Sequence, residues 1–313
     1  MTITLLQGDA RSVLKSLPSE SIQVCVTSPP YYGLRAYLPD GHPDKASEIG
    51  LEQSPAEYVA QMVEVFREVR RVLRTDGTLW LNLGDSYAND GKWGGSSGGK
   101  HVTALHGQSG VGRGKKVTGL KPKDLMLIPA RVAIAMQDDG WWIRSEIIWS
   151  KSAPMPESVR DRPTCAHEKV WLLTKASTYF YDADAVAENA TSNAADGKRG
   201  DGASYSFKPT AKATHMGVKA DGTRNLRNVW HLNPEPFPGA HFATMPATLA
   251  ERCIKAGSKP GDTVLDPFAG AGTTLLVADR LQRNAVGIEL NPDYCDLIRK
   301  RLAADAPLLS EVA

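Results

Sequence analysis

The chain has 313 residues, of which 42% are hydrophobic and 23% are charged, and its formal net charge at pH 7 is +2. This length and apolar content suffice for one large globular domain, and no apolar run approaches the roughly 18 residues that a membrane-spanning helix needs. The N-terminal residues lack the basic and apolar regions of a secretory signal, so the sequence favours an intracellular protein.

Short apolar runs alternate with helical patterns along the first half of the chain, as expected of βα units around a mostly parallel sheet. Strands are predicted at 3–7, 24–27 and 78–83, with a short helix at 10–18 between the first two. A longer helix is predicted over 55–74, with Pro55 in its first turn and Asp76-Gly77 as its stop. Beyond a glycine-rich stretch, a helix follows at 125–136 and strands follow at 147–149 and 169–174.

The second half begins with residues 177–235, which show no sustained periodicity. Regular patterns then return. Helices are predicted at 246–256, 273–282 and 294–302, and strands at 263–265 and 286–288. The chain therefore predicts α/β architecture that is interrupted by one long irregular region.

Two segments concentrate the basic residues. From 92 to 123 there are seven Lys or Arg and no acid, with ten glycines from Gly91 to Gly119, and from 197 to 228 seven basic residues accompany two acids. Two solvated insertions would explain such segments. A chain that carries both, with an acidic remainder, favours a polyanionic partner such as nucleic acid.

The stretch "VCVTSPPYY" runs from Val24 to Tyr32 and ends a predicted strand in a rigid turn. The two prolines fix φ and remove two backbone donors, so the carbonyl groups of the turn are left to accept hydrogen bonds. A Pro-Pro turn with surface tyrosines is the bland interpretation. The alternative is a loop that holds a polar group of a substrate.

A second stretch, "VLDPFAGAGTTLLVADRLQRNAVGIELN", places an acidic residue after each of two strands and a glycine turn between them. This pattern is typical of sites that bind an adenosine-containing cofactor at the carboxyl ends of parallel strands. Gly270 and Gly272 let the backbone approach the ligand, and Glu289 is placed to accept hydrogen bonds from ribose hydroxyls. Leu275 stands where a dinucleotide fingerprint requires its third glycine, which argues against a pyrophosphate cofactor such as NAD.

Together, "TSPPYY" and "DPFAGAGTT" resemble motifs IV and I of the amino-methyltransferases of DNA, which move a methyl group from S-adenosylmethionine to an exocyclic amine. The catalytic motif precedes the cofactor motif, as in the β class of that family. Further matches cover nearly the whole chain: "LLQGDA" resembles motif III, "GTLWLNLGDSY" motif VI, "HFATMPATLAERCI" motif X and "GIELNPDYC" motif II.

The resemblance implies an α/β, Rossmann-like class I methyltransferase fold with a mostly parallel seven-stranded sheet flanked by helices. The implied strand order is 3-2-1-4-5-7-6, with strand 1 at 263–265, strand 4 at 24–27 and an antiparallel strand 7 at 169–174. Residues 1–176 would form the catalytic half with the basic loop at 90–123, residues 177–235 the inserted target-recognition region, and residues 236–313 the cofactor-binding half.

In the family's chemistry, Ser28 Oγ and the Pro29 carbonyl would accept the two N–H groups of the amine, and Tyr31 would stack on a base flipped out of the duplex. Ser rather than Asp at the first position of the tetrapeptide points to the N4 amine of cytosine, with the N6 amine of adenine as the alternative. A methyltransferase of RNA or of a protein amide and a non-catalytic DNA-binding protein stay open as rival classes.

The resemblance assigns residues as follows. The catalytic residues are Ser28, Pro29, Pro30 and Tyr31. The residues for S-adenosylmethionine are Asp9, Asp266, Pro267, Phe268, Gly270, Gly272, Thr273, Glu289, Leu290, Asn291, His241, Phe242 and Thr244. The residues for double-stranded DNA are Lys92, Arg113, Lys115 and Lys116, which would clamp phosphates, and Arg224 and Arg227, which would read base edges. The expected location is a prokaryotic cytoplasm, with a companion restriction endonuclease as a further expected partner.

Other residues have structural interpretations. Asp9 is as well placed to cap a helix as to contact the cofactor. Asp85 is expected to make structural hydrogen bonds, and His167-Glu168 is interpreted as a strand-edge pair rather than half of a zinc motif. The four cysteines contain no C-x-x-C pair, which argues against a metal site.

Overall fold

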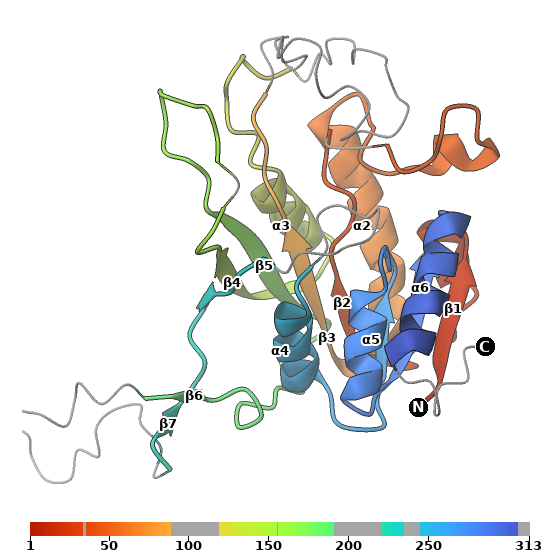
Figure 1. Ribbon diagram of the computed structural model, residues 1–313, viewed down its shortest axis with the longest axis vertical. Coiled ribbons are helices and arrows are strands. Elements are labelled where there is room, and N and C mark those ends of the chain that lie inside the picture. The colour runs from red at the N-terminus through yellow and green to blue at the C-terminus, as the bar shows by residue number, and fades with distance from the viewer. Residues whose placement is uncertain are drawn as a thin grey trace, which may run out of the picture.

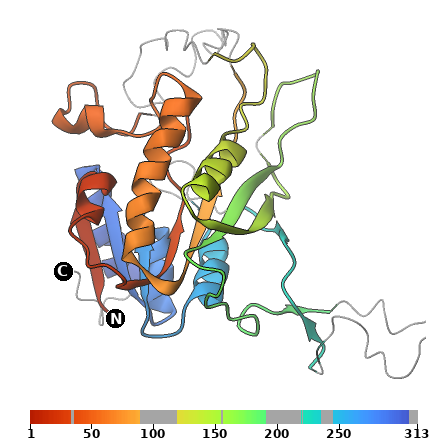
Figure 2. The same ribbon diagram turned by 180° about the vertical axis from the view of Figure 1, so that it is seen from behind.

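The computed structural model describes residues 1–33, 36–88, 119–154, 156–190, 219, 221–234 and 245–305. Within these ranges an eight-stranded sheet of order β1-β10-β9-β2-β3-β5-β4-β8 runs through the molecule, with helices on both faces (Figures 1 and 2). The strands of this sheet are β1 (Ile3–Gln7), β2 (Ile22–Thr27), β3 (Leu73–Leu83), β4 (Trp142–Ser150), β5 (His167–Thr174), β8 (Val229–His231), β9 (Thr263–Asp266) and β10 (Asn284–Glu289). A small separate ladder pairs β6 (Glu188–Asn189) with β7 (Thr223–Arg224).

Two apolar layers cover the sheet. The helices of one layer are α1 (Ala10–Leu14), α2 (Pro55–Val72) and α3 (Ile128–Asp138), and those of the other are α4 (Ala247–Gly257), α5 (Thr273–Arg280) and α6 (Pro292–Asp305). None of these helices is both long and apolar enough to span a membrane. Along β2, Val24 and Val26 pack in the layer of α4 to α6, whereas Cys25 packs in the other. All six residues of β2 are buried, as a strand covered on both faces requires.

The predicted order of seven strands is confirmed. β1 pairs in parallel with β10, and β9 lies between β10 and β2, so strands from the two ends of the chain are interleaved. β5 is antiparallel to both β3 and β4. The carboxyl ends of β1, β10, β9 and β2 therefore meet at one edge of the sheet, although their residues come from opposite ends of the sequence.

The predicted end of the long helix was wrong. α2 ends at Val72 instead of continuing to residue 74, because Leu73 already pairs with Ile22 of β2 and begins β3. Asp76-Gly77 lies inside that strand and does not stop the helix. A Cβ at Gly77 would lie 3.0 Å from the Gln23 carbonyl oxygen, so this glycine allows the close approach of β3 to β2.

The eighth strand comes from the region that the sequence left irregular. β8 pairs in parallel with β4, and Trp230 stands opposite Trp149. The Trp230 side chain is 2% exposed, its ring centroid lies 6.2 Å from that of Trp80, and its Nε1–H donates to the Arg227 carbonyl. A single indole thus attaches the end of the predicted target-recognition region to the sheet.

If Trp230 holds β8 on the sheet, Trp230→Ala should lower the free energy of unfolding by about 3 to 5 kcal/mol, the cost of emptying a buried indole site. Urea unfolding followed by far-UV circular dichroism measures this change. Val229→Ala is the matched control, because the neighbouring Val229 is 46% exposed and should change stability by less than about 0.5 kcal/mol. Equal losses in both variants would show that β8 is not held by this side chain.

Candidate active site

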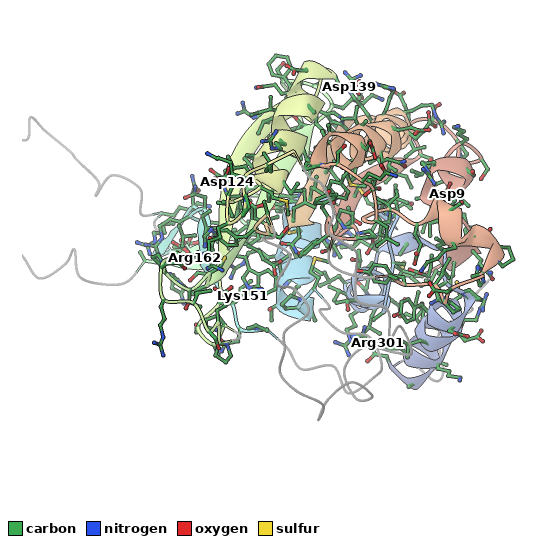
Figure 3. All side chains as sticks on the ribbon, turned by 90° about the horizontal axis from the view of Figure 1, so that it is seen from above. Asp9, Asp124, Asp139, Lys151, Arg162 and Arg301 are labelled. Atoms are coloured by element: carbon green, nitrogen blue, oxygen red, sulfur yellow. The ribbon has the colours of Figure 1, made fainter. Side chains whose placement is uncertain are left out.

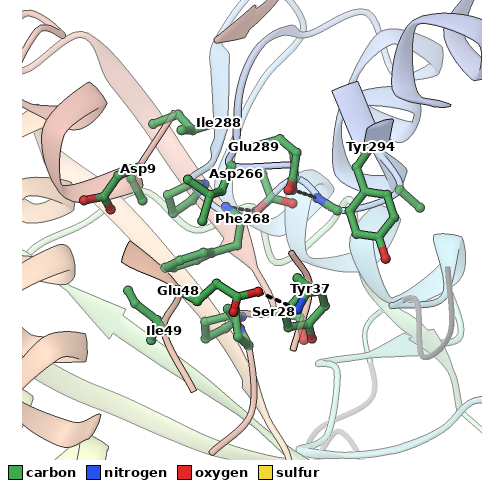
Figure 4. A pocket seen from close by; sticks show the side chains of 18 of the residues that line it. Asp9, Ser28, Tyr37, Glu48, Ile49, Asp266, Phe268, Ile288, Glu289 and Tyr294 are labelled. Carbon is green, nitrogen blue, oxygen red and sulfur yellow. Dashed lines mark hydrogen bonds between the residues drawn. The ribbon is translucent and has the colours of Figure 1, made fainter. Parts of the chain in front are cut away.

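A pocket opens at the carboxyl ends of β1, β10, β9 and β2 (Figure 4). Twelve of the predicted site residues line it: Asp9, Ser28, Pro29, Pro30, Tyr31, Asp266, Pro267, Phe268, Gly270, Thr273, Glu289 and Leu290. The fold therefore brings the two predicted motifs to one cavity. It does so because β2, which leads into the Ser-Pro-Pro-Tyr loop, is the direct neighbour of β9, which leads into the glycine turn.

Asp266 stands at the end of β9 and is only 4% exposed. Its Oδ1 accepts hydrogen bonds from Thr27 Oγ1 at 2.7 Å and from the Phe268 backbone N–H at 3.1 Å. Burial raises the pKa of Asp266 to about 6, against the lowering effect of these hydrogen bonds. The carboxylate is thus held in place by two strands at the floor of the pocket.

Glu289 ends β10 and presents its carboxylate to the same cavity. Its two oxygens accept the backbone N–H groups of Gly270 and Asn291, each at 2.8 Å. Burial raises the pKa of Glu289 to about 7. Because one N–H binds each oxygen, the carboxylate has a fixed orientation, with lone pairs left for vicinal hydroxyls such as those of a ribose.

The glycine turn has the backbone that the sequence pattern requires. Gly270 and Gly272 have φ of 54° and 75°, a left-handed conformation that favours glycine. A Cβ at Gly272 would also lie 3.0 Å from two carbon atoms of Ile298, so this glycine serves helix packing and not the pocket wall. The turn presents its backbone at the amino end of α5, in the cradle expected for a ligand.

Residues 36–50 form a cover over the pocket that the sequence did not indicate. Glu48 accepts the backbone N–H groups of Tyr37 and Leu38, each at 2.5 Å, and the Tyr37 carbonyl accepts Asn291 Nδ2 at 2.9 Å. Tyr37, Glu48 and Ile49 line the pocket (Figure 4). The predicted cofactor residue Asn291 therefore acts from behind the cavity wall, by holding this cover.

The Ser-Pro-Pro-Tyr loop is fixed by side chains from several elements. The Pro30 carbonyl accepts the hydroxyl of Tyr58, on α2, at 2.8 Å. Ser28 Oγ accepts Asn82 Nδ2 at 3.2 Å and lies 3.4 Å from the Tyr31 hydroxyl. The bland interpretation of this loop as a turn with surface tyrosines is wrong, because Ser28 and Tyr31 line the pocket instead.

Two residues that the sequence did not assign to the site lie against Tyr31. Asn82 is a polar residue inside the apolar run of β3, and that break in the pattern was its only signal. Glu168, at the beginning of β5, is confirmed as a strand residue, but its carboxylate accepts the Tyr31 hydroxyl at 2.6 Å. The pattern around Glu168 gave no indication of this contact.

Two predicted acidic residues have structural contacts. Asp9 caps α1, with its Oδ1 accepting the Arg11 backbone N–H at 3.1 Å, and it also lines the pocket (Figures 3 and 4). Asp85 Oδ1 accepts the backbone N–H groups of Ser86 and Ile128, which confirms its structural interpretation. The first turn of α3 is thereby fixed beside the carboxyl end of β3.

The structure does not bring Arg224 and Arg227 to the pocket. Both donate through Nε to Glu188 Oε1, at 2.7 and 2.5 Å. The β6–β7 ladder that contains Arg224 lies at the far end from the strand carboxyl edge (Figures 1 and 2). The other predicted DNA-binding residues, Lys92, Arg113, Lys115 and Lys116, and the motif X residues His241, Phe242 and Thr244 lie outside the described residues.

This strand order, with an acidic residue after each of the neighbouring strands β9 and β10, defines the class I methyltransferase fold. The model of the DNA methylase family (N6_N4_Mtase) matches residues 22–300. The chain belongs to this DNA methylase family, whose methyl donor is S-adenosylmethionine, as predicted.

Relatives and solved structures agree with this family. The Type II methyltransferase M.Cfr9I of Citrobacter freundii is 45% identical over 96% of this chain and 88% of its own length. The Thermus thermophilus DNA modification methylase TTHA0409, solved in complex with S-adenosyl-L-methionine, has a TM-score of 0.60 and 26% identity over the full length of both chains. The cytosine-N4-specific PvuII DNA methyltransferase has a TM-score of 0.62 and 21% identity over 99% of this chain and 95% of its own.

The pKa of Glu289 predicts how cofactor affinity depends on pH. An ionised carboxylate accepts ribose hydroxyls better than a neutral one, and the raised pKa means that Glu289 takes up a proton as the pH falls through about 7. Affinity for S-adenosylmethionine should fall by up to about tenfold between about pH 8 and about pH 6. Calorimetric titration at the two pH values measures it. Glu289→Gln should bind more weakly and lose most of this pH dependence, and an unchanged pH profile in that variant would contradict the assignment.

Proposed function

We propose that the protein methylates the N4 amine of cytosine in double-stranded DNA. The observation that carries this proposal is Ser28, a neutral hydroxyl at the first position of the catalytic tetrapeptide, with its Oγ at the wall of the cofactor pocket. The alternative is the N6 amine of adenine, which the family also includes. Ser28 favours cytosine because Asp is the usual residue here among enzymes that the sequence resembles and that modify adenine.

The pocket supplies acceptors and positioning. S-adenosylmethionine, when bound, supplies an electrophilic methyl group, and Asp266 and Glu289 are the residues that would hold its adenosine portion. Ser28 Oγ and the Pro29 carbonyl would accept the two N–H groups of the target amine and favour a pyramidal nitrogen with its lone pair free to react. Since the nitrogen becomes acidic only once it is methylated, no strong base is needed, and positioning within about 3 Å contributes most of the rate.

Tyr31 supplies the surface on which the flipped base would stack. Its side chain lines the pocket beside Ser28, and burial together with the nearby Glu168 raises the pKa of its phenol well above the usual value. The phenol therefore stays neutral at any working pH. A neutral aromatic face suits an extruded base, which loses its stacking in the duplex.

The basic loop at 90–123 is proposed to clamp DNA phosphates. Its flanking residues are joined by backbone hydrogen bonds between Ala88 and Asp124 and between Lys123 and Ala88, each 2.7 Å long. Both flanks lie beyond the carboxyl end of β3, at the edge of the sheet that carries the pocket (Figure 1). Phosphate contacts there would hold the duplex over the site.

The remaining assignments are also proposals. Residues 177–235 form the target-recognition region, although β8 within them joins the sheet, and they separate the catalytic half (1–176) from the cofactor-binding half (236–313). Arg224 and Arg227 would read base edges from a position that Glu188 holds. Because M.Cfr9I is named a Type II methyltransferase, we propose a companion restriction endonuclease and a bacterial cytoplasm as the place of action.

The proposed chemistry is tested with purified protein, radiolabelled S-adenosylmethionine and unmethylated duplex DNA, with RNA of the same sequence as the control substrate. Mass spectrometry of the digested DNA should find N4-methylcytosine, whereas N6-methyladenine would contradict the choice of amine. Tyr31→Ala should lower turnover about tenfold to a hundredfold, the value of one base–aromatic stacking contact, and leave cofactor affinity unchanged. An equal loss of affinity would mean that the loop is structural.

The two kinds of DNA contact are separable by mutation. Neutralising Arg113, Lys115 and Lys116 should weaken binding to every sequence and reduce the slope of log affinity against log salt by about 0.9 per lost phosphate contact. Arg224→Gln or Arg227→Gln should instead change which sequences are methylated. Filter binding at several salt concentrations and methylation mapping provide the two measurements. A changed sequence preference in the first set, with uniform weakening in the second, would reverse the two roles.

A further inference from the structure

Four elements converge on the hydroxyl of Tyr31. The loop after β2 supplies Tyr31 itself, β3 supplies Asn82, the carboxyl end of β4 leads to Lys151, and β5 supplies Glu168. Tyr31 donates to Glu168 Oε2 at 2.6 Å, and Asn82 Nδ2 lies 2.7 Å from the Tyr31 oxygen and 3.0 Å from Glu168 Oε2. Lys151 Nζ forms an ion pair with the other oxygen of Glu168.

This cluster is sheltered from solvent. The side chains of Lys151 and Glu168 are 21% and 16% exposed, and Asn82 is 2% exposed. Lys151 also lies 4.7 Å above the Trp149 ring, which fixes the ammonium beside its partner. A sheltered carboxylate needs such compensation, and here it receives one cation and two hydrogen-bond donors. Glu168 is therefore a rigid acceptor for the Tyr31 hydroxyl.

The Tyr31 ring is also confined along its edge. A Cβ added at Gly84 would lie 2.5 Å from Tyr31 Cε2 and 2.9 Å from Cδ2, so the backbone of residue 84 already touches the ring. The ring is thus held by backbone contact on one edge and by Glu168 at its tip. Both contacts come from elements that contribute nothing to the cofactor motif.

We propose that Glu168 is a positioning residue for methyl transfer. It holds the Tyr31 ring in the orientation in which a flipped base stacks, and through Asn82 the same cluster orients Ser28. A ring anchored at its hydroxyl has already lost the freedom about its two side-chain torsions, so the base does not have to immobilise it. This role rests on the proposed function of the Ser-Pro-Pro-Tyr loop.

The test is a double-mutant cycle with Tyr31→Phe and Glu168→Gln. Tyr31→Phe keeps the stacking ring and removes only the anchored hydroxyl. Each variant should slow single-turnover methyl transfer to duplex DNA about tenfold, the value of a charge-assisted hydrogen bond. The double variant should be slowed about tenfold as well, rather than about a hundredfold, because both changes break one interaction. Cofactor affinity by calorimetry should equal that of the wild type in all three variants.

A second readout follows the base itself. With 2-aminopurine at the target position, both single variants should show stronger fluorescence in the bound complex than the wild type, because the extruded base stacks less firmly. A merely structural role of Glu168 would lower the melting temperature and would not move this signal in Tyr31→Phe.

Glu146→Gln is the matched control. Glu146 makes an ion pair with Lys169 across the same two strands, β4 and β5, but has no contact with Tyr31 among those that the structure describes. It should methylate at the wild-type rate. Wild-type rates in Tyr31→Phe, or multiplicative losses in the double variant, would overturn the proposal.

The outcome also separates this inference from the proposed function. If Tyr31→Ala loses activity while Tyr31→Phe and Glu168→Gln do not, the catalytic loop stands and the anchoring role is wrong. If Tyr31→Ala keeps full activity, the assignment of the loop itself is wrong. If Glu168→Gln does not fold, the rate and fluorescence of Tyr31→Phe decide the question alone.

Discussion

The pairing of β2 with β9 is the constraint on which the site depends. Val24 and Cys25 stand opposite Val264 and Leu265, and at the carboxyl ends Thr27 Oγ1 donates to Asp266 at 2.7 Å across 239 residues of sequence. The two strands are buried on both faces, so their relative position is fixed by close packing. A loop that follows one strand and a turn that follows the other are thereby held within one pocket, without any direct link along the chain.

The pocket is held at a cost in stability. Burial raises the pKa values of Asp266 and Glu289 above those of ordinary carboxyl groups, so the folded protein binds protons that the unfolded chain has already released. The free energy of unfolding therefore decreases as the pH rises from the ordinary carboxyl range through about 7. A ligand that donates hydrogen bonds to these carboxylates offsets this cost, which couples the stability of the fold to occupation of the site.

Much of the sheet could be predicted from the sequence because its strands end in residues with recognisable chemistry. Asp266 and Ser28 mark the ends of adjacent strands, and the order of the remaining strands follows from the family pattern. The end of α2 could not be predicted, because Leu73 continues the apolar helical spacing, and only its pairing with Ile22 turns the chain into a strand. β8 was missed because three residues with a single buried Trp230 give no periodicity.

The site contacts that were missed share one physical origin. Glu168 reaches Tyr31 only because β5 runs antiparallel to β3, which brings the beginning of one strand to the end of the other; Leu83 stands opposite Lys169. The direction of a side chain at a strand end depends on this pairing and not on the local sequence. The cover formed by residues 36–50 likewise depends on Glu48 and Asn291, which are far apart in sequence.

The two reactants would be held by separate networks of hydrogen bonds. On the cofactor side, Glu289 accepts the backbone of Asn291, whose side chain in turn holds Tyr37. On the side of the base, the Tyr31 hydroxyl is held by Glu168 and Asn82. Methyl transfer requires the two reacting atoms to meet at about 3 Å, and flexible loops could not ensure this on their own. The distance is therefore set by the packed strands between the networks, and the loops only refine it.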